Sequence, residues 1–218
     1  MSTPRSTAVT RLREKQRTDR AGLDALLDAV HVGHLGFVDD AGLPRVMPSA
    51  VLRDGDRLVT HGSTGSPWLR RLATGVPACV EVTAVDGIVV ARSAFESSIR
   101  YRSAVLYGAF EPVPAAAKAA ALDRVTDALL PGRRGEIRGH TDRELAATLV
   151  LAMPIATWSL KVSDAWPEDP PEDVAGPAWA GVVPVREVYG AALPAPDLRA
   201  GIRLPDSVRG LGSRGPVP

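Results

Sequence analysis

The feature that most constrains the fold is a succession of short apolar segments separated by turn-forming residues. Residues 32–38, 45–52 and 57–61 are rich in Val, Leu and other apolar residues, and Asp and Gly dominate residues 39–42 and 54–56 between them. Short runs bounded in this way are typical of antiparallel strands joined by tight turns. The segment therefore predicts three consecutive strands, the first two of which form a hairpin.

Two short helices are expected beside these strands. Leu residues recur at helical spacing over residues 18–30, where Thr18 or Asp19 can cap the first turn. Residues 67–73 follow the third strand and begin with Pro67, whose missing N–H costs nothing at the first helical position. The sequence thus predicts one helix before the strands and one after them.

Strand-like segments return after residue 77. Residues 78–85 and 88–92 flank Asp86-Gly87, which predicts a turn between two strands, and residues 101–113 form a longer apolar run. Alternation over residues 155–162 predicts a last strand. Together with the first three, these segments give about six or seven strands, and the sequence predicts a mainly β fold with flanking helices.

The remaining segments are predicted to be helices and extended connections. Residues 115–130 and 142–153 are rich in Ala and Leu, which favours helix. Residues 164–177 contain several prolines among acidic residues, which predicts an extended loop. Residues 199–218 are rich in Gly, Pro and Arg, and we expect them to be disordered unless a partner covers them.

The composition is that of a single globular domain with extensions. The chain has 218 residues, of which 45% are hydrophobic, enough to bury a core. Residues 1–17 carry many charges and few large apolar side chains, so we expect a flexible N-terminal arm. Residues 18–185 form the predicted domain, and we expect residues 186–218 to form a C-terminal extension, rich in Pro, Gly and Arg, that is partly disordered.

The charge balance and the single cysteine exclude several classes of protein. Lys and Arg total 26 against 25 Asp and Glu, which lacks the positive charge of a nucleic-acid-binding protein. Cys79 lies in an apolar strand and is interpreted as a buried small hydrophobe, in keeping with a reducing cytoplasm. No apolar run approaches the roughly 18 residues of a membrane span, so we expect a cytoplasmic protein that binds no membrane.

A loop of small residues after the third strand is the strongest candidate for a binding site. Its glycines permit close approach of the backbone, its hydroxyls can donate hydrogen bonds, and the following helix start favours an anion. The same residues would equally serve to turn the chain and to cap the helix. The loop runs His61-Gly62-Ser63-Thr64-Gly65-Ser66.

Two further segments can contribute to a site. Arg102, followed by Ser103, leads into an apolar strand and would lie at a barrel rim, where it can meet an anion or pair with a carboxylate. Pro48, between Met47 and Ser49, cannot donate to a sheet ladder, so its stretch lies at an edge or faces something other than a strand. A ligand is one candidate for that neighbour.

The order of these motifs resembles the pyridoxamine 5'-phosphate oxidase-like family of FMN-binding split barrels, and more narrowly its nitroimidazole-resistance-like branch. The resemblance covers about residues 20–185, and the ordered set of motifs is more specific than any one of them. The motifs are Gly42-Leu43-Pro44, His61 to Ser66, Asp86 to Ser93, Tyr101-Arg102-Ser103 and Trp179-Ala180-Gly181-Val182.

The resemblance implies a six-stranded antiparallel split barrel that forms a homodimer, with FMN held in clefts between the two subunits. Met47, Pro48 and Ser49 would lie along the isoalloxazine ring. The residues that would surround the phosphate, close the site or lie near the ring are His61, Gly62, Ser63, Thr64, Ser66, Trp68, Arg102, Ser103 and Trp179. For Trp179, the alternative is an aromatic anchor that fixes a returning tail.

The chain departs from the family pattern at the phosphate loop. In the pyridoxine-metabolising members an Arg-Lys pair stands where this chain has Pro67 and Trp68. Arg70 and Arg71 remain nearby and can compensate, but a phosphate without a close cation is held less tightly. Oxidation of pyridoxamine phosphate is therefore not the expected reaction.

The four histidines differ in the roles that the sequence suggests for them. His61 lies at the candidate loop, where it could be a phosphate donor, a substrate contact, an axial haem ligand or only a hydrogen-bonded residue at a strand end. His31 and His34 straddle the junction between the first helix and the first strand, and we expect no metal pair there. His140 lies in an Arg-rich loop and is expected to face solvent.

Three functions stay open from the sequence. The first is an FMN-dependent oxidoreductase that transfers electrons or hydride to a small molecule, with a nicotinamide donor. The second is a flavin- or haem-binding protein that uses the same cleft without turnover. The third is a reductase that uses a deazaflavin. No catalytic acid or base is identified, because no paired carboxylates or His–Asp arrangement lies near the candidate site.

Overall fold

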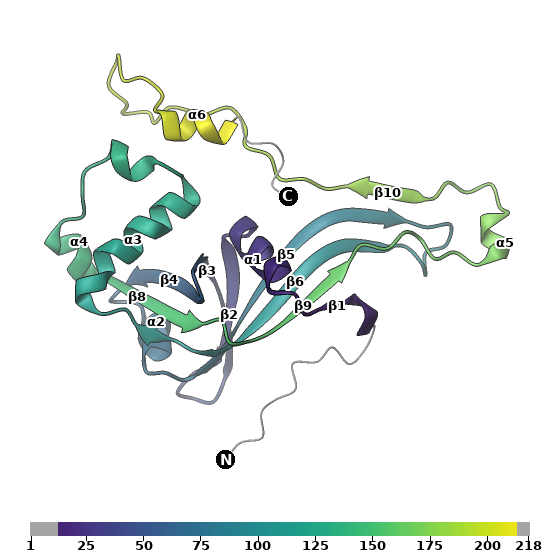
Figure 1. Cartoon of the computed structure of the whole chain (residues 1–218), viewed down its shortest axis with the longest axis horizontal. Coiled ribbons are helices and arrows are strands. Elements are labelled where there is room, and N and C mark those ends of the chain that lie inside the picture. The colour runs from purple at the N-terminus through teal and green to yellow at the C-terminus, as the bar shows by residue number, and fades with distance from the viewer. Residues whose placement is uncertain (1–12, 213–218) are drawn as a thin grey trace.

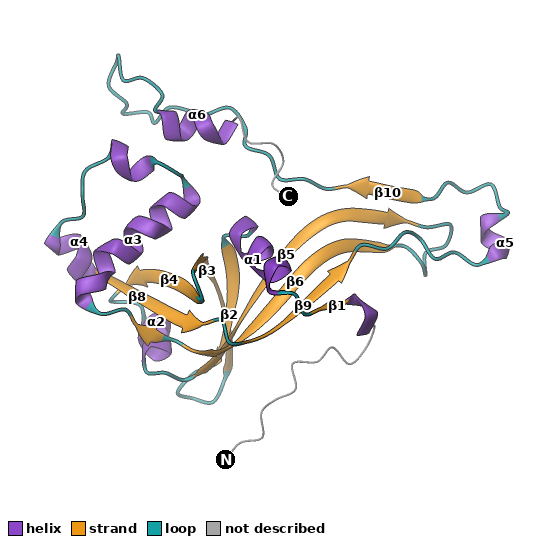
Figure 2. Ribbon diagram, in the orientation of Figure 1, coloured by secondary structure: helices purple, strands orange, loops and turns teal. Residues whose placement is uncertain are grey.

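The computed structural model describes residues 13–212, and its dominant element is one antiparallel sheet of ten strands. Figure 1 shows this sheet curving through the molecule, and Figure 2 shows one helix against the middle of the sheet and the others around it. The strands are β1 (Gln16–Arg17), β2 (Val32–Val38), β3 (Pro44–Asp54), β4 (Arg57–Ser63), β5 (Pro77–Val90), β6 (Ser98–Ala109), β7 (Glu111–Pro112), β8 (Thr148–Pro154), β9 (Thr157–Ser163) and β10 (Gly181–Pro184).

The neighbouring strands lie in the order β1-β9-β6-β5-β2-β3-β4-β8-β7, and β10 adds to β5. The helices are α1 (Arg20–Ala29), α2 (Pro67–Ala73), α3 (Ala115–Leu129), α4 (Asp142–Ala147), α5 (Pro171–Val174) and α6 (Asp206–Gly212), with 3-10 turns η1 (Arg13–Lys15) and η2 (Arg133–Glu136). None of these helices is long and apolar enough to cross a membrane.

The core lies inside the curved sheet and includes side chains of α1 and α2. Alternate residues of β2 and β5 point inward, as in Leu35 and Val80, which are fully buried. Leu23, Leu26 and Leu27 of α1 are also buried, and each contributes about 2 kcal/mol by removal from water. A second apolar cluster joins α3 to β3, β4 and β8. This arrangement is consistent with the predicted split barrel.

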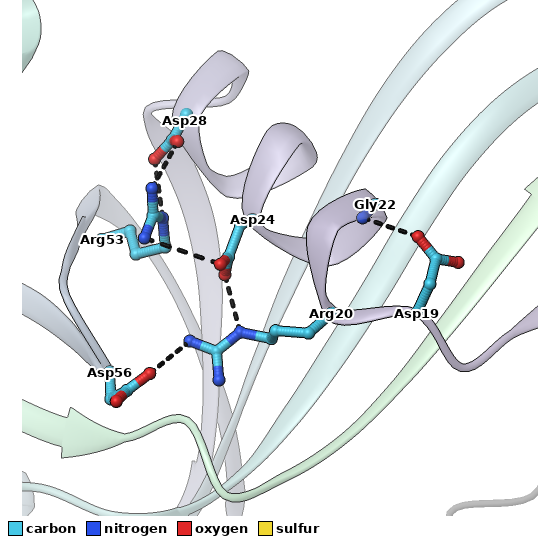
Figure 3. Close-up of polar contacts among 7 residues, drawn as sticks. All are labelled: Asp19, Arg20, Gly22, Asp24, Asp28, Arg53 and Asp56. Carbon is cyan, nitrogen blue, oxygen red and sulfur yellow. Dashed lines mark hydrogen bonds and ion pairs between the residues drawn. The ribbon is translucent and has the colours of Figure 1, made fainter.

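The helix α1 begins where the sequence predicts, because Asp19 caps it. The Asp19 carboxylate accepts a hydrogen bond of 2.8 Å from the Gly22 N–H, one of the donors that a helix start leaves without an intrahelical partner (Figure 3). Thr18, the other candidate cap, is exposed and takes no part in this bond. Of the two predicted caps, Asp19 is therefore the one in use.

A polar network joins α1 to β3 and to the turn that follows it (Figure 3). Arg53 of β3 bonds to Asp28 at 2.6 and 2.8 Å and lies 3.7 Å from Asp24. Arg20 bonds to Asp24 at 2.7 Å and to Asp56 at 2.9 Å. Partly exposed ion pairs contribute about 0–1 kcal/mol each, so the network orients α1 while the buried leucines hold it.

The cap can be tested by mutation. We expect Asp19→Ala to lower the free energy of unfolding by about 1 kcal/mol, because the Gly22 N–H loses its partner. Thr18→Ala is the matched control and should leave it unchanged. Urea unfolding followed by circular dichroism measures both variants, and equal stabilities for the two would contradict the assignment of the cap.

The predicted turn at Asp86-Gly87 is wrong. β5 runs unbroken through these residues, and the register with β6 shifts between Val85 and Gly87, which is a β-bulge. A Cβ on Gly87 would lie 3.0 Å from the Val183 carbonyl oxygen. Glycine is therefore needed here because β10 passes close to the strand, and the two predicted strands are one.

The predicted helix over residues 142–153 is also wrong in its second half. α4 ends at Ala147, and Thr148–Pro154 form β8, which pairs with β4 over seven residues and also with β7. The buried residues Val150 to Met153 are stabilised more by their place between two strands than by their helical propensity. This strand and the short β1, β7 and β10 raise the count above the predicted six or seven.

The segment after β9 lies against the rest of the chain at several points. The expected loop over residues 164–177 contains the short helix α5, and Asp169, with a side chain 1% exposed, binds Arg92 at 2.9 Å. Ser207 of α6 donates to Glu136 of η2 at 2.5 Å. Residues 1–12 and 213–218, parts of the predicted arm and extension, lie outside the described residues, and the domain boundaries stay predictions.

Candidate functional site

Three of the predicted flavin-binding residues lie where β3 has a neighbouring strand on one side only. β3 pairs with β2 over residues 44–50, whereas its pairing with β4 begins at Val51. Within residues 13–212, no strand lies along the second edge of Met47, Pro48 and Ser49. Pro48, which has no N–H to donate, thus stands at a sheet edge.

The side chains of these residues point in different directions. Met47 lies opposite Leu35 and packs partly against the core, whereas Pro48 is exposed on the outer face of the sheet, opposite His34. The Ser49 hydroxyl lies 3.2 Å from the hydroxyl of Thr60, which is buried in β4. This contact joins the β3 segment to the strand that carries the predicted phosphate loop.

The loop after β4 uses part of its hydrogen-bonding capacity on itself. The Ser63 hydroxyl accepts from the Gly65 N–H at 3.1 Å, and the Ser66 N–H donates to the Ser63 carbonyl at 3.0 Å. Thr64 donates both its N–H and its hydroxyl to the Ala147 carbonyl. The Ser66 hydroxyl caps no N–H of α2. The hydroxyl protons of Ser63 and Ser66 thus remain available to an anion.

Contacts within the chain account for several residues that the sequence placed at or near the binding loop. A Cβ on Gly62 would lie 2.6 Å from Leu69 Cδ1, so the glycine lets α2 pack on β4. Arg71 pairs with Asp40 at 2.8 Å, away from the loop. Arg70 is exposed and is the cation of α2 that has no recorded partner among the described residues, and Trp68 packs partly against the core.

His61 is the candidate residue with the most perturbed environment. Its Nδ1 atom is buried and has no hydrogen-bond partner among the described residues. Burial lowers the pKa of the imidazole below 6.5, because the charged form loses hydration. At neutral pH the ring is therefore neutral, the form that can accept a hydrogen bond or bind a metal.

The lowered pKa makes stability depend on pH. Between the folded pKa and about 6.5 the unfolded chain binds more protons at this position, so the free energy of unfolding falls as the pH drops through that range. We expect His61→Gln to reduce this dependence. Urea unfolding of both proteins at pH 7.5 and pH 5 measures this pH dependence. An NMR titration in which the His61 midpoint lies at or above 6.5 would contradict the lowered pKa.

Arg102 and Ser103 lie on β6, away from the loop. Arg102 forms two hydrogen bonds with Asp86, of 2.9 and 2.8 Å, and hydrogen bonding to this carboxylate is the main cause that raises the pKa of the guanidinium. The carboxylate pairing considered from the sequence is thus present. Ser103 pairs with Thr83 and Lys161 in the neighbouring strands.

Trp179 precedes β10 and is 67% exposed. Its ring covers Gly181, where a Cβ would lie 2.8 Å from two ring atoms. β10 lies at the right of Figure 1, whereas β4 and α2 lie at the left. Within one chain the predicted site residues therefore form two groups, one on β3, β4 and α2 and the other on β6 and the segment before β10.

A cavity of about 380 Å³ on the outer face of the sheet was missed by the sequence reasoning. It lies between the junction of α1 and β2 and the C-terminal segment, and its walls include His31, His34, Thr83 and Tyr189. His34 Nδ1 lies 3.0 Å from Glu81 Oε2. The alternation of β2 could have placed His34 on the outer face, but its partners are distant in the sequence.

The other titratable candidates are accounted for locally. His140 lies 3.0 Å from Asp123 and is partly buried, so it does not simply face solvent. Cys79 is a free thiol of intermediate exposure. Within the described ranges, no group of three or more His, Cys, Asp or Glu side chains could hold a metal ion.

Comparison with known proteins identifies the family. A family model described as pyridoxamine 5'-phosphate oxidase matches residues 19–162. The chain belongs to this family. None of the curated proteins matches it.

Two solved structures resemble the whole chain. The FAD and haem binding protein from Mycobacterium smegmatis is 55% identical, with a TM-score of 0.89, over 93% of this chain and 98% of that one. The flavocytochrome Anf3 from Azotobacter vinelandii is 34% identical, with a TM-score of 0.88, over 94% of this chain and 95% of that one.

The narrower resemblance to the nitroimidazole-resistance-like branch is not supported. A protein described as a 5-nitroimidazole antibiotic resistance protein from Bacteroides thetaiotaomicron is 19% identical, with a TM-score of 0.57, over 67% of this chain and 86% of that one. This likeness shows the fold alone, and the two flavin–haem proteins are far more similar in sequence and in length covered.

Proposed function

We propose that this protein binds FAD and haem and serves in electron transfer, as a flavocytochrome of the pyridoxamine 5'-phosphate oxidase family. The observation that carries the proposal is the 55% identity with the FAD and haem binding protein over 93% of the chain. The alternative of a flavin- or haem-binding protein is thus favoured over an FMN oxidoreductase. A flavin exchanges one or two electrons and a haem exchanges one.

FAD replaces FMN as the proposed flavin. One of the two similar proteins is described as binding FAD, the other is described as a flavocytochrome, and neither description specifies FMN. The residues that would hold it are the edge segment of β3 and the loop after β4. Ser63 and Ser66 have hydroxyl protons to donate, and the exposed Arg70 supplies the positive charge that the loop otherwise lacks.

Haem is proposed because the match to the FAD and haem binding protein extends beyond the residues that the family model covers. The family model ends at residue 162, and a match over 93% of the chain must include most of the residues after 162. The match to the nitroimidazole-resistance protein covers 67%. The C-terminal segment is therefore shared with the proteins described as haem-binding or as a flavocytochrome.

A homodimer is part of the proposal. Predicted flavin-binding residues lie in two groups that one chain does not bring together, and a second copy can supply the missing group. The outer face of the sheet offers a contact surface, since it exposes apolar side chains on β3, β5 and β6. They include Val46 at 65%, Val85 at 43% and Tyr107 at 37% exposure.

The cofactor content of the purified protein tests the main proposal. We expect flavin absorbance together with a haem Soret band, and we expect the released flavin to gain fluorescence on treatment with phosphodiesterase, which cleaves FAD to FMN. Chromatography against FAD and FMN standards is the control. Released FMN alone would contradict the flavin assignment, and a protein that takes up no haem when haemin is added would contradict the haem assignment.

The dimer is tested by placing a charge in its proposed interface. Val46→Asp should give a monomer in sedimentation equilibrium and weaken flavin binding, because a buried carboxylate without a partner is costly. Val174→Asp is the matched control, since Val174 is 52% exposed on α5, away from this face. A monomeric wild type, or a Val46→Asp dimer, would contradict the proposal.

The remaining functional expectations stay predictions. A nicotinamide donor, a small-molecule substrate and a deazaflavin in place of FMN are tested by none of the comparisons. Stopped-flow mixing of the anaerobic protein with NADH or NADPH, followed at the flavin absorbance, would decide the first of them.

A further inference from the structure

The cavity on the outer face of the sheet exists because of how the C-terminal segment returns. One edge of β5 pairs with β2 over residues 78–81 and with β10 over residues 87–90. The chain leaves β10 antiparallel to β5, and Val185 still donates to the Asp86 carbonyl at 3.1 Å. Residues 187–189 then lie across from Thr83 and enclose the space.

His34 is the best placed ligand in this cavity. Its Nδ1 is held 3.0 Å from a Glu81 oxygen, and no described residue is bonded to Nε2. The side chain is 52% exposed, so the free nitrogen is accessible from the cavity that the residue lines. An imidazole bonded to a carboxylate through one nitrogen and open at the other is the usual arrangement of a histidine that binds a metal.

The walls fit a haem. Ala29, Val30, Val32 and Val188 give the cavity apolar sides, and its volume of about 380 Å³ lies in the range of cofactor pockets. Tyr189, whose phenol is another group that can bind haem iron, also lines the cavity.

A smaller hollow, lined by two arginines and two acidic residues, adjoins the cavity. Both share Ala29, Val30 and Glu187, and the hollow also includes Arg186. Arg186 is exposed, and no ion pair is recorded for it in residues 13–212. A guanidinium beside an apolar cavity suits the propionate carboxylates of a haem.

We propose that this cavity is the haem site and that His34 Nε2 is an axial ligand of the haem iron, with Glu81 as a positioning residue that orients the imidazole. The assignment rests on the proposed function, which supplies the haem. It replaces His61, for which a haem ligand is one of several roles left open by the sequence. The Nδ1 atom of His61 is buried without any polar partner to orient the ring.

The position of the proposed haem site suits exchange of electrons with the proposed flavin. The register of β2 and β3 places His34 directly opposite Pro48, in the segment proposed to lie along the flavin ring. Adjacent strands lie about 4.8 Å apart, so the two cofactors would be close neighbours on one face of the sheet.

Haemin titration of the haem-free protein tests the ligand. The wild type should develop a Soret band, His34→Ala should develop a shifted and much weaker one, and added imidazole should restore it by filling the vacated ligand position. His140→Ala is the matched control, because His140 bonds to Asp123 elsewhere, and it should behave as the wild type. Circular dichroism and flavin absorbance verify that each variant is folded.

The outcomes separate the two proposals. A wild type that binds no haemin overturns the proposed haem function and this assignment with it. A wild type that binds haemin while His34→Ala keeps an unchanged Soret band overturns the assignment alone. Loss of the band in His61→Ala but not in His34→Ala would return the ligand to His61.

The positioning residue is tested by Glu81→Gln. The variant should still bind haemin, with an affinity lowered by about tenfold, and its reduction potential should rise, because a neutral amide makes the imidazole a weaker electron donor than the carboxylate does. Potentiometric titration measures the potential. A potential equal to that of the wild type would show that Glu81 does not act through His34.

Discussion

The structure depends on how the two edges of β5 are covered. Backbone groups within a sheet are costly when left unpaired, so the 14 residues of this strand offer both edges to neighbouring strands. β6 covers one edge almost completely, whereas β2 covers only the first part of the other edge and β10 covers the last part. β10 thereby brings the C-terminal segment beside β2 and fixes where the following residues lie.

The sequence predicted those elements whose signals are local. α1, α2 and the hairpin of β2 and β3 follow from a cap, an N-terminal proline and a turn that lie within a few residues of them. The unbroken β5 could not be predicted, because Asp86-Gly87 suits a turn as well as a bulge, and only the close passage of β10 over Gly87 decides between them. β8 was missed because pairing with β4 overrides its helical composition.

The same distinction applies to the candidate site. The residue types at the loop were identified, but Thr64 is bound by Ala147 and Arg102 by Asp86, partners that no local pattern reveals. His34 was set aside because it stands near the junction of a helix and a strand. Its significance comes from Glu81, 47 residues away, and from a wall formed by the last part of the chain.

The late position of that wall has a consequence for biosynthesis. The strands of the curved sheet other than β10 are complete by Ser163, so they can fold while the ribosome is still producing the rest. The cavity is closed only when residues 187–189 dock. A molecule that occupies it binds the docked chain and not the undocked one, and therefore stabilises the docked C-terminal segment by a free energy that grows with the logarithm of its affinity.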